Sequence, residues 1–107
     1  MSGGQMVKLD DENFDAETGS GVTLVDFYAD WCGPCRMLAP VLEQVAADLG
    51  AKAKVGKLDI DKSHKIAGNF QVTSVPTMIL FKDGKEVNRL VGLREAKEIV
   101  DFVTAAL

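Results

Sequence analysis

The chain has 107 residues, of which 47% are hydrophobic and 26% are charged, and its formal net charge is −4. This length and composition fit one globular domain that can form a hydrophobic core without a stabilising disulfide or metal. The acidic balance argues against nucleic acid as a partner. No apolar run is long enough for a membrane span, and the first ten residues lack the apolar stretch of a secretory signal. We therefore expect a cytoplasmic protein without a membrane partner.

The first half of the chain predicts a tail and three elements. Residues 1–6 are expected to form a flexible N-terminal tail before a single domain over 7–107. Early acidic residues favour a first helix over 11–18, because they suit the positive end of the helix dipole. A nearly continuous apolar, β-prone run over 22–29 predicts a strand covered on both faces. Apolar residues at helical spacing then predict a helix from Pro34 that is kinked at Pro40 and ends at Gly50.

The second half predicts further strands and helices. They are a strand over 55–60, a short helix within 61–70, strands over 77–81 and 86–91, and an amphipathic helix over 96–107. Asp83-Gly84 between the last two strands is a strong signal for a two-residue hairpin. This order of elements gives parallel crossovers followed by an antiparallel pair. We expect an α/β fold with a mixed sheet sandwiched by helices.

The only two cysteines lie three residues apart in the string Trp31-Cys32-Gly33-Pro34-Cys35. At the start of a helix this spacing places both on one face with Cα atoms about 5–6 Å apart, which a reversible disulfide tolerates. In a reducing compartment a close pair favours redox or metal chemistry over a structural disulfide. Zinc needs about four ligands, and the chain offers only His64 besides, which is expected to be a solvated helix residue.

The start of the helix predicts different roles for the two thiols. Cys32 is expected to be exposed at the N-terminus, where free N–H groups and the helix dipole favour its thiolate, so it is the candidate nucleophile. Cys35, one turn deeper, is the candidate resolving thiol that opens a mixed disulfide. Gly33 would let a target peptide approach the sulfur, and Pro34 suits the first turn, although both could be simple helix-start residues.

Asp26 interrupts the apolar strand over 22–29, so its carboxyl is expected to be buried, with a raised pKa. It could accept the proton of Cys35, with Lys57 close enough to tune it. A structural ion pair between Asp26 and Lys57 explains the same two residues equally well on the sequence alone.

Together these strings resemble the thioredoxin family, from about Val7 to Leu107. The matching strings are Val25-Asp26-Phe27, Ala29, Trp31-Cys32-Gly33-Pro34-Cys35-Arg36-Met37, Ala39-Pro40, Lys57-Leu58, Asp61, Val75-Pro76-Thr77, Phe81-Lys82-Asp83-Gly84 and Val91-Gly92. Tyr28 and Arg36 are mild departures, because Trp and Lys are frequent at these positions in the family. Arg36 keeps the positive charge but could alter the preference for partners.

The resemblance implies the α/β thioredoxin fold, in which four helices flank a central mixed five-stranded sheet. It also implies a dithiol carrier that reduces disulfides in target proteins. It favours proton transfer through Asp26, tuned by Lys57, over the structural ion pair. It also implies that Pro76 follows a cis peptide bond beside the sulfurs, where the Val75 backbone would pair with an extended target segment. The residues expected to form a flat apolar rim around Cys32 are Trp31, Gly33, Pro34, Val75, Pro76, Gly92 and Leu93.

The resemblance also implies how the carrier is recycled. A thioredoxin reductase drawing on NADPH would reduce the Cys32–Cys35 disulfide, while the chain itself binds no cofactor and acts as a monomer. Two alternatives stay open. One is an oxidase or isomerase, which the dipeptide Gly33-Pro34 disfavours, and the other is a protein-binding module that uses the surface around Trp31 without thiol turnover.

Overall fold

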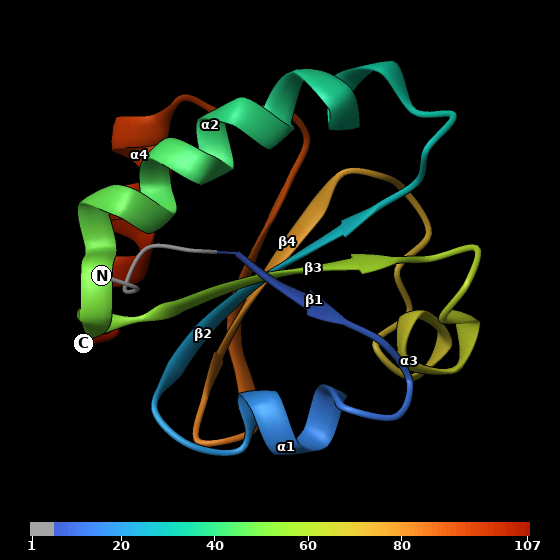
Figure 1. Ribbon diagram of the computed structural model, residues 1–107, viewed down its shortest axis with the longest axis horizontal. Coiled ribbons are helices and arrows are strands. Elements are labelled where there is room, and N and C mark those ends of the chain that lie inside the picture. Colours follow the sequence, from blue (N-terminus) through green and yellow to red (C-terminus); the bar gives the residue numbers. More distant parts are fainter. Residues whose placement is uncertain (1–5) are drawn as a thin grey trace.

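The computed structural model describes residues 6–107. Its strands are β1 (Met6–Leu9), β2 (Val22–Tyr28), β3 (Lys54–Asp59), β4 (Thr77–Lys82) and β5 (Lys85–Val91). Its α-helices are α1 (Phe14–Thr18), α2 (Gly33–Leu49), α3 (His64–Asn69) and α4 (Ala96–Thr104), and the short 3-10 turn η1 (Gly50–Lys52) follows α2 (Figure 1). The expected tail lies outside the described residues except for Met6, which is the first residue of β1.

The five strands form one sheet in the order β1-β3-β2-β4-β5. Parallel pairing joins β1 to β3 and β3 to β2, whereas β4 is antiparallel to both β2 and β5. The expected mixed five-stranded sheet with four helices is thus confirmed. Strand β2 lies at its centre, and all of its seven residues except the last, Tyr28, are buried.

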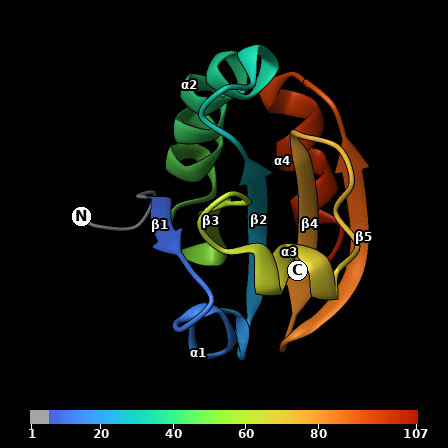
Figure 2. The same ribbon diagram turned by 90° about the vertical axis from the view of Figure 1, so that its right-hand side faces the viewer.

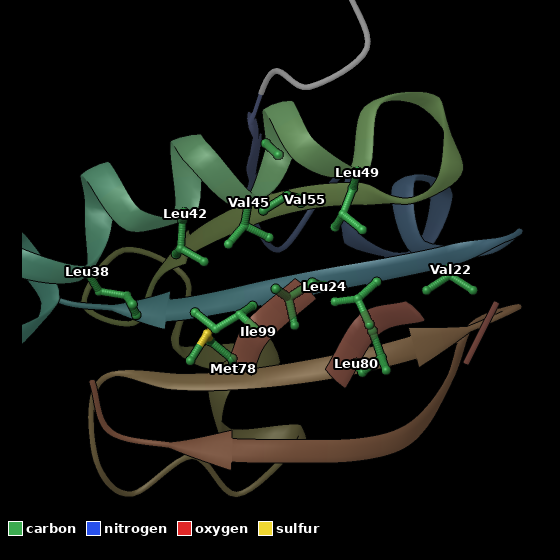
Figure 3. Close-up of a cluster of buried hydrophobic side chains, with 12 residues drawn as sticks. Val22, Leu24, Leu38, Leu42, Val45, Leu49, Val55, Met78, Leu80 and Ile99 are labelled. Carbon is green, nitrogen blue, oxygen red and sulfur yellow. The ribbon is translucent and has the colours of Figure 1, made fainter. Parts of the chain in front are cut away.

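The helices cover the two faces of the sheet in pairs, α2 with α4 and α1 with α3 (Figures 1 and 2). Alternating residues of β2 therefore enter two different cores. Figure 3 shows the first of these, in which side chains of α2 point toward the sheet and meet residues of β2 and β4. The labelled residues of this core are Val22, Leu24, Leu38, Leu42, Val45, Leu49, Val55, Met78, Leu80 and Ile99.

The hairpin and the long helix follow the sequence closely. Asp83 and Gly84 have φ of 50° and 85°, so both lie in the left-handed region that a two-residue turn of this kind requires. Helix α2 contains Pro40, changes direction along its length in Figure 1, and ends before Gly50, whose φ is 57°. A glycine tolerates this conformation at a helix end at little cost.

The first and last helices are shorter than expected, and both boundaries were wrong. Helix α1 begins at Phe14 rather than Asp11, because the Asp10 carboxylate accepts hydrogen bonds from the backbone N–H of Glu12 and Asn13 and holds the intervening residues in a turn. Helix α4 ends at Thr104 and not at Leu107, and the last residues form a turn.

Candidate active site

The disulfide lies where β2 leads into α2, at one end of the sheet (Figure 2). Cys32 is the N-cap of α2, and its Sγ accepts a hydrogen bond of 3.2 Å from the backbone N–H of Cys35. The two residues are joined by a disulfide with their Cα atoms 5.2 Å apart, within the predicted range. The location of Cys32 at the N-terminus of a helix is therefore confirmed.

The expected exposure of Cys32 was wrong. The residue is only 5% exposed, and Cys35 is 4% exposed, so burial alone does not distinguish the two. Cys32 packs with Ala29 and Val75, and its Sγ lies 3.7 Å from the carbonyl oxygen of Val75. A segment more than forty residues away along the chain therefore covers the sulfur, and local helix geometry could not predict this.

Asp26 lies in the middle of β2 and is 4% exposed, as expected. Its Oδ1 has no hydrogen-bond partner among the described residues. Removal from water disfavours the charged carboxylate and raises its pKa to about 7, although the positive charge of Lys57 acts in the opposite direction. The predicted buried carboxyl with a raised pKa is confirmed.

Asp26 and Cys35 line the same cavity, which has a volume of about 200 Å³. Tyr28 and Lys57 also line it, and so do Asp30, Arg36 and Glu43, which surround it with further charges. The lining combines these charged side chains with the apolar Met6, Ala29 and Ala39, and the volume is large enough for several water molecules. The buried carboxyl and the inner cysteine therefore border the same space.

Lys57 lies opposite Asp26 in the register of β2 and β3, but it is exposed. The ion pairs found within residues 6–107 do not include one between these two residues. The Lys57 ammonium nitrogen instead lies 5.9 Å from the centroid of the Tyr28 ring. The structural ion pair that the sequence left open is therefore not the arrangement found.

Trp31 is 67% exposed, and its indole Nε1–H donates a 2.8 Å hydrogen bond to Oδ2 of Asp61. Sequence reasoning missed this contact. The available signal was topological: Trp31 follows β2 and Asp61 follows β3, and these strands are parallel neighbours whose carboxyl ends lie at the same edge of the sheet.

The other residues expected at the rim come from three segments: the start of α2, the residues before β4 and the residues after β5. The Val75–Pro76 peptide bond is cis, as expected, and the backbone N–H of Gly92 donates a 2.9 Å hydrogen bond to the carbonyl of Pro76. Pro76 is buried and so offers mainly its backbone, whereas Pro34 and Leu93 are exposed and Gly33 is partly exposed. Met37, which the sequence did not single out, is 62% exposed and shares a groove with Leu93.

Metal binding and membrane insertion both concern the part of the chain over 6–107. This part of the chain holds no group of three or more side chains arranged to bind a metal ion, and His64 is exposed at the start of α3. No helix described here is long and apolar enough to cross a membrane.

Comparison with known proteins gives concordant matches. Residues 5–105 match the family model described as Thioredoxin. The thioredoxin of Staphylococcus saprophyticus subsp. saprophyticus is 48% identical to this chain over 98 residues, which cover 92% of the chain and 94% of that protein. The thioredoxin of Staphylococcus haemolyticus is 49% identical over 98 residues with the same coverage.

A solved structure gives the same result for the fold. A mutant thioredoxin from Halobacterium salinarum NRC-1 is similar to this chain with a TM-score of 0.88 and 36% sequence identity. The match covers 98% of this chain and 93% of that one. The sequence matches and the structural match thus both extend over nearly the whole length of this chain.

Proposed function

The chain belongs to the thioredoxin family and is a thiol–disulfide oxidoreductase, a protein-disulfide reductase, and from this premise we propose that Cys32 is its nucleophile and Cys35 its resolving thiol. The position of Cys32 at the N-terminus of α2 supports this assignment, because the positive end of the helix dipole stabilises a thiolate. Once the disulfide is reduced, Cys32 would therefore form a thiolate more readily than Cys35.

The proposed reaction has two exchange steps. The Cys32 thiolate attacks a target disulfide, so that a bond forms between Cys32 and one target sulfur while the other target sulfur leaves as a thiolate and takes up a proton. Cys35 then loses its proton and attacks the Cys32 sulfur, which releases the second target thiol. Two electrons pass to the target, and the carrier is left with the Cys32–Cys35 disulfide seen in the structure.

Asp26 is proposed as the proton acceptor for Cys35, either directly or through a water in the shared cavity. A carboxyl with a pKa of about 7 is suited to take up a proton near neutral pH and to release it afterwards. Lys57 tunes this group, because its positive charge favours the carboxylate. The shared cavity of Asp26 and Cys35 is the single observation that carries the assignment.

The rim around the disulfide is proposed to bind the target polypeptide. An extended segment would pair with the backbone of Val75 and rest on Trp31, with Gly33 leaving room beside the sulfur. Recognition through backbone groups would admit many targets. The other residues assigned to this rim are Pro34, Pro76, Gly92 and Leu93.

Family membership supports the remaining parts of the proposal. The disulfide is recycled by a thioredoxin reductase that draws on NADPH, and the domain over 7–107 works as a cytoplasmic monomer that binds no cofactor of its own. Its partners are this reductase and target proteins with disulfides.

Asp26→Ala tests the mechanism when the two exchange steps are timed separately. In Cys35→Ser the mixed disulfide with a target accumulates, so its formation reports the first attack alone, with and without Asp26→Ala. In proteins that retain Cys35, decay of the mixed disulfide reports the resolving step. We expect Asp26→Ala to slow the second step and to leave the first largely unchanged. Equal slowing of both steps would contradict the role of Asp26.

The direction of electron flow is tested by the reduction potential of the Cys32–Cys35 pair in defined dithiol buffers. A value near about −270 mV is expected for a reductant, whereas a value of about −180 to −120 mV would assign the chain to the isomerases or oxidases. Replacing both cysteines by serine tests the binding module, since a role that survives this change does not depend on thiol turnover.

A further inference from the structure

Three side chains of the cavity lie on one face of the sheet. Asp26 and Tyr28 are two residues apart on β2, so they point to the same side. Lys57 lies directly opposite Asp26 on the parallel strand β3. The face is the one covered by α2, and all three residues line the cavity beside Cys35.

Within residues 6–107 the Lys57 ammonium makes one cation–π contact, with the ring of Tyr28. The nitrogen lies 5.9 Å from the ring centroid, at the outer range of a cation–π contact. No hydrogen bond or ion pair of the described residues involves the Lys57 side chain. A lysine side chain is a flexible stem of four carbons, so without such a contact its ammonium group would occupy many positions in solvent.

The surrounding charges do not fix this position by themselves. Lys8 lies beside Lys57 in the register of β1 and β3, and it repels the ammonium from the outer side. Asp30, Arg36 and Glu43 line the cavity from the loop before α2 and from α2 itself, so opposite charges are spread around it. Asp59 lies two residues after Lys57 on β3 and opposite Tyr28, but its Oδ1 accepts a hydrogen bond from the backbone N–H of Asp61.

We propose that Tyr28 is a positioning residue whose aromatic ring holds the Lys57 ammonium beside Asp26 and so controls how readily the buried carboxyl exchanges its proton. The ring, and not the hydroxyl, does this. Burial together with the negative charges of Asp59, Asp30 and Asp26 raises the Tyr28 pKa, so the phenol stays neutral near pH 7. The consequence for Cys35 rests on the proposed role of Asp26, whereas the positioning itself does not.

The test is a titration of the Asp26 carboxyl, followed by its side-chain carbon signal in nuclear magnetic resonance. The oxidised protein is used, because disulfide-bonded cysteines do not titrate. The variants are Tyr28→Leu, Tyr28→Phe and Lys57→Met, together with the double variant of Tyr28→Leu and Lys57→Met.

We expect Tyr28→Leu to shift the Asp26 titration to higher pH, because the ammonium is no longer held near the carboxylate. The shift should be smaller than that of Lys57→Met, which removes the charge altogether. Tyr28→Phe keeps the ring and should leave the titration unchanged. When Lys57 is already methionine, Tyr28→Leu should not raise the titration further.

A merely structural role of Tyr28 predicts a different pattern. A smaller side chain would admit water to the cavity, which lowers the cost of charging Asp26 and shifts its titration to lower pH. A downward shift, no shift, or an upward shift that persists in the Lys57→Met background would overturn the inference. Circular dichroism and the thermal midpoint show whether each variant is folded.

The native protein provides a second readout that does not depend on how Tyr28→Leu folds. Protons on the Lys57 side chain that lie over the ring should resonate upfield of those of a solvated lysine, and the same shift should be present in Tyr28→Phe. Unshifted Lys57 resonances in the native protein would overturn the positioning.

The resolving step separates this inference from the proposed function. If the Asp26 titration shifts as expected and the pH profile of mixed-disulfide decay shifts with it, the results support both the positioning of Lys57 by Tyr28 and the role of Asp26 as proton acceptor. If the titration shifts but the profile of decay does not, Tyr28 positions Lys57 as inferred and Asp26 is not the proton acceptor.

Discussion

The indole of Trp31 is held by a residue thirty positions further along the chain, through the 2.8 Å hydrogen bond from its Nε1–H to Oδ2 of Asp61. Asp61 is held in turn, because its backbone N–H donates a 2.8 Å hydrogen bond to Oδ1 of Asp59. The ring belongs to the residue before Cys32, is 67% exposed and is nevertheless held by this hydrogen bond. A fixed aromatic surface loses little entropy when a target covers it.

Replacing Asp61 by alanine should release this ring. We expect the KM for a protein disulfide to rise about fivefold with little change in kcat, which corresponds to the loss of one hydrogen bond of ordinary strength. The anisotropy of Trp31 fluorescence should fall in the free protein. Because both side chains are exposed, the free energy of unfolding should change by less than about 0.5 kcal/mol.

The matched control is Asp61→Asn, which keeps a side-chain oxygen that can accept the same hydrogen bond without the charge. It should retain most of the anisotropy and most of the affinity. An unchanged KM in Asp61→Ala would show that anchoring Trp31 has no part in target binding.

Gly33→Ala separates clearance for a target from stability of the fold. A Cβ at this position meets nothing within 4 Å, and the same is true of Gly68 in α3. Alanine at either position should therefore leave the free energy of unfolding unchanged or raise it by up to about 1 kcal/mol. Only Gly33→Ala should lower kcat/KM for protein disulfides, by several-fold, because its methyl group meets the incoming peptide. Wild-type kcat/KM in Gly33→Ala would remove Gly33 from the rim.

Gly56 illustrates the opposite case, a glycine that the fold itself requires. A Cβ there would lie 2.7 Å from Cδ1 of Leu9 and 3.2 Å from the carbonyl oxygen of Val7. Gly56→Ala should lower the free energy of unfolding by about 1–3 kcal/mol in a denaturant titration, since the buried side chain of Leu9 must move. In a double-mutant cycle with Leu9→Ala, the double variant should lose less free energy of unfolding than the sum of the losses in the two single variants. Full additivity would show that Leu9 does not cause the strain.

Much of this fold could be predicted because its signals are local. The apolar run of β2, the helical spacing after Pro34 and the turn at Asp83-Gly84 each act within a few residues, and the structure confirms all three. The start of α1 was missed although its cause is also local. There the Asp10 side chain competes with the helix for backbone N–H groups, and a periodicity of apolar residues does not report such competition.

The sequence could predict which residues form the candidate site, but not which distant residues cover or orient them. Asp26 could be identified because a carboxyl in an apolar strand is unusual, and its burial follows from the strand alone. The burial of Cys32 depends on Val75, and the orientation of Trp31 depends on Asp61. These contacts arise only when the sheet brings distant loops to one edge, so they follow from the topology and not from the local sequence.

The buried carboxyl of Asp26 should make the stability of the protein depend on pH. Its pKa is about 7 in the folded state and close to the ordinary value of 3.8 in the unfolded chain. Between these two values the folded state holds a proton that the unfolded state has lost, so the free energy of unfolding falls as the pH rises. The contribution of Asp26 to the free energy of unfolding is therefore fully present below about pH 4 and is lost by about pH 7. The total change over this range is on the order of 4 kcal/mol.

Asp26→Asn isolates this effect, because it keeps the shape of the side chain and removes its titration. In denaturant titrations between pH 4 and pH 8, the difference in the free energy of unfolding between this variant and the native protein should be small at pH 4 and should grow with pH in favour of the variant. The reason is that charging a carboxylate whose Oδ1 has no partner among the described residues costs free energy, whereas an amide stays neutral. A difference that does not change with pH would mean that Asp26 does not titrate in this window, and a variant that is less stable at pH 8 would mean that the charged carboxylate stabilises the fold.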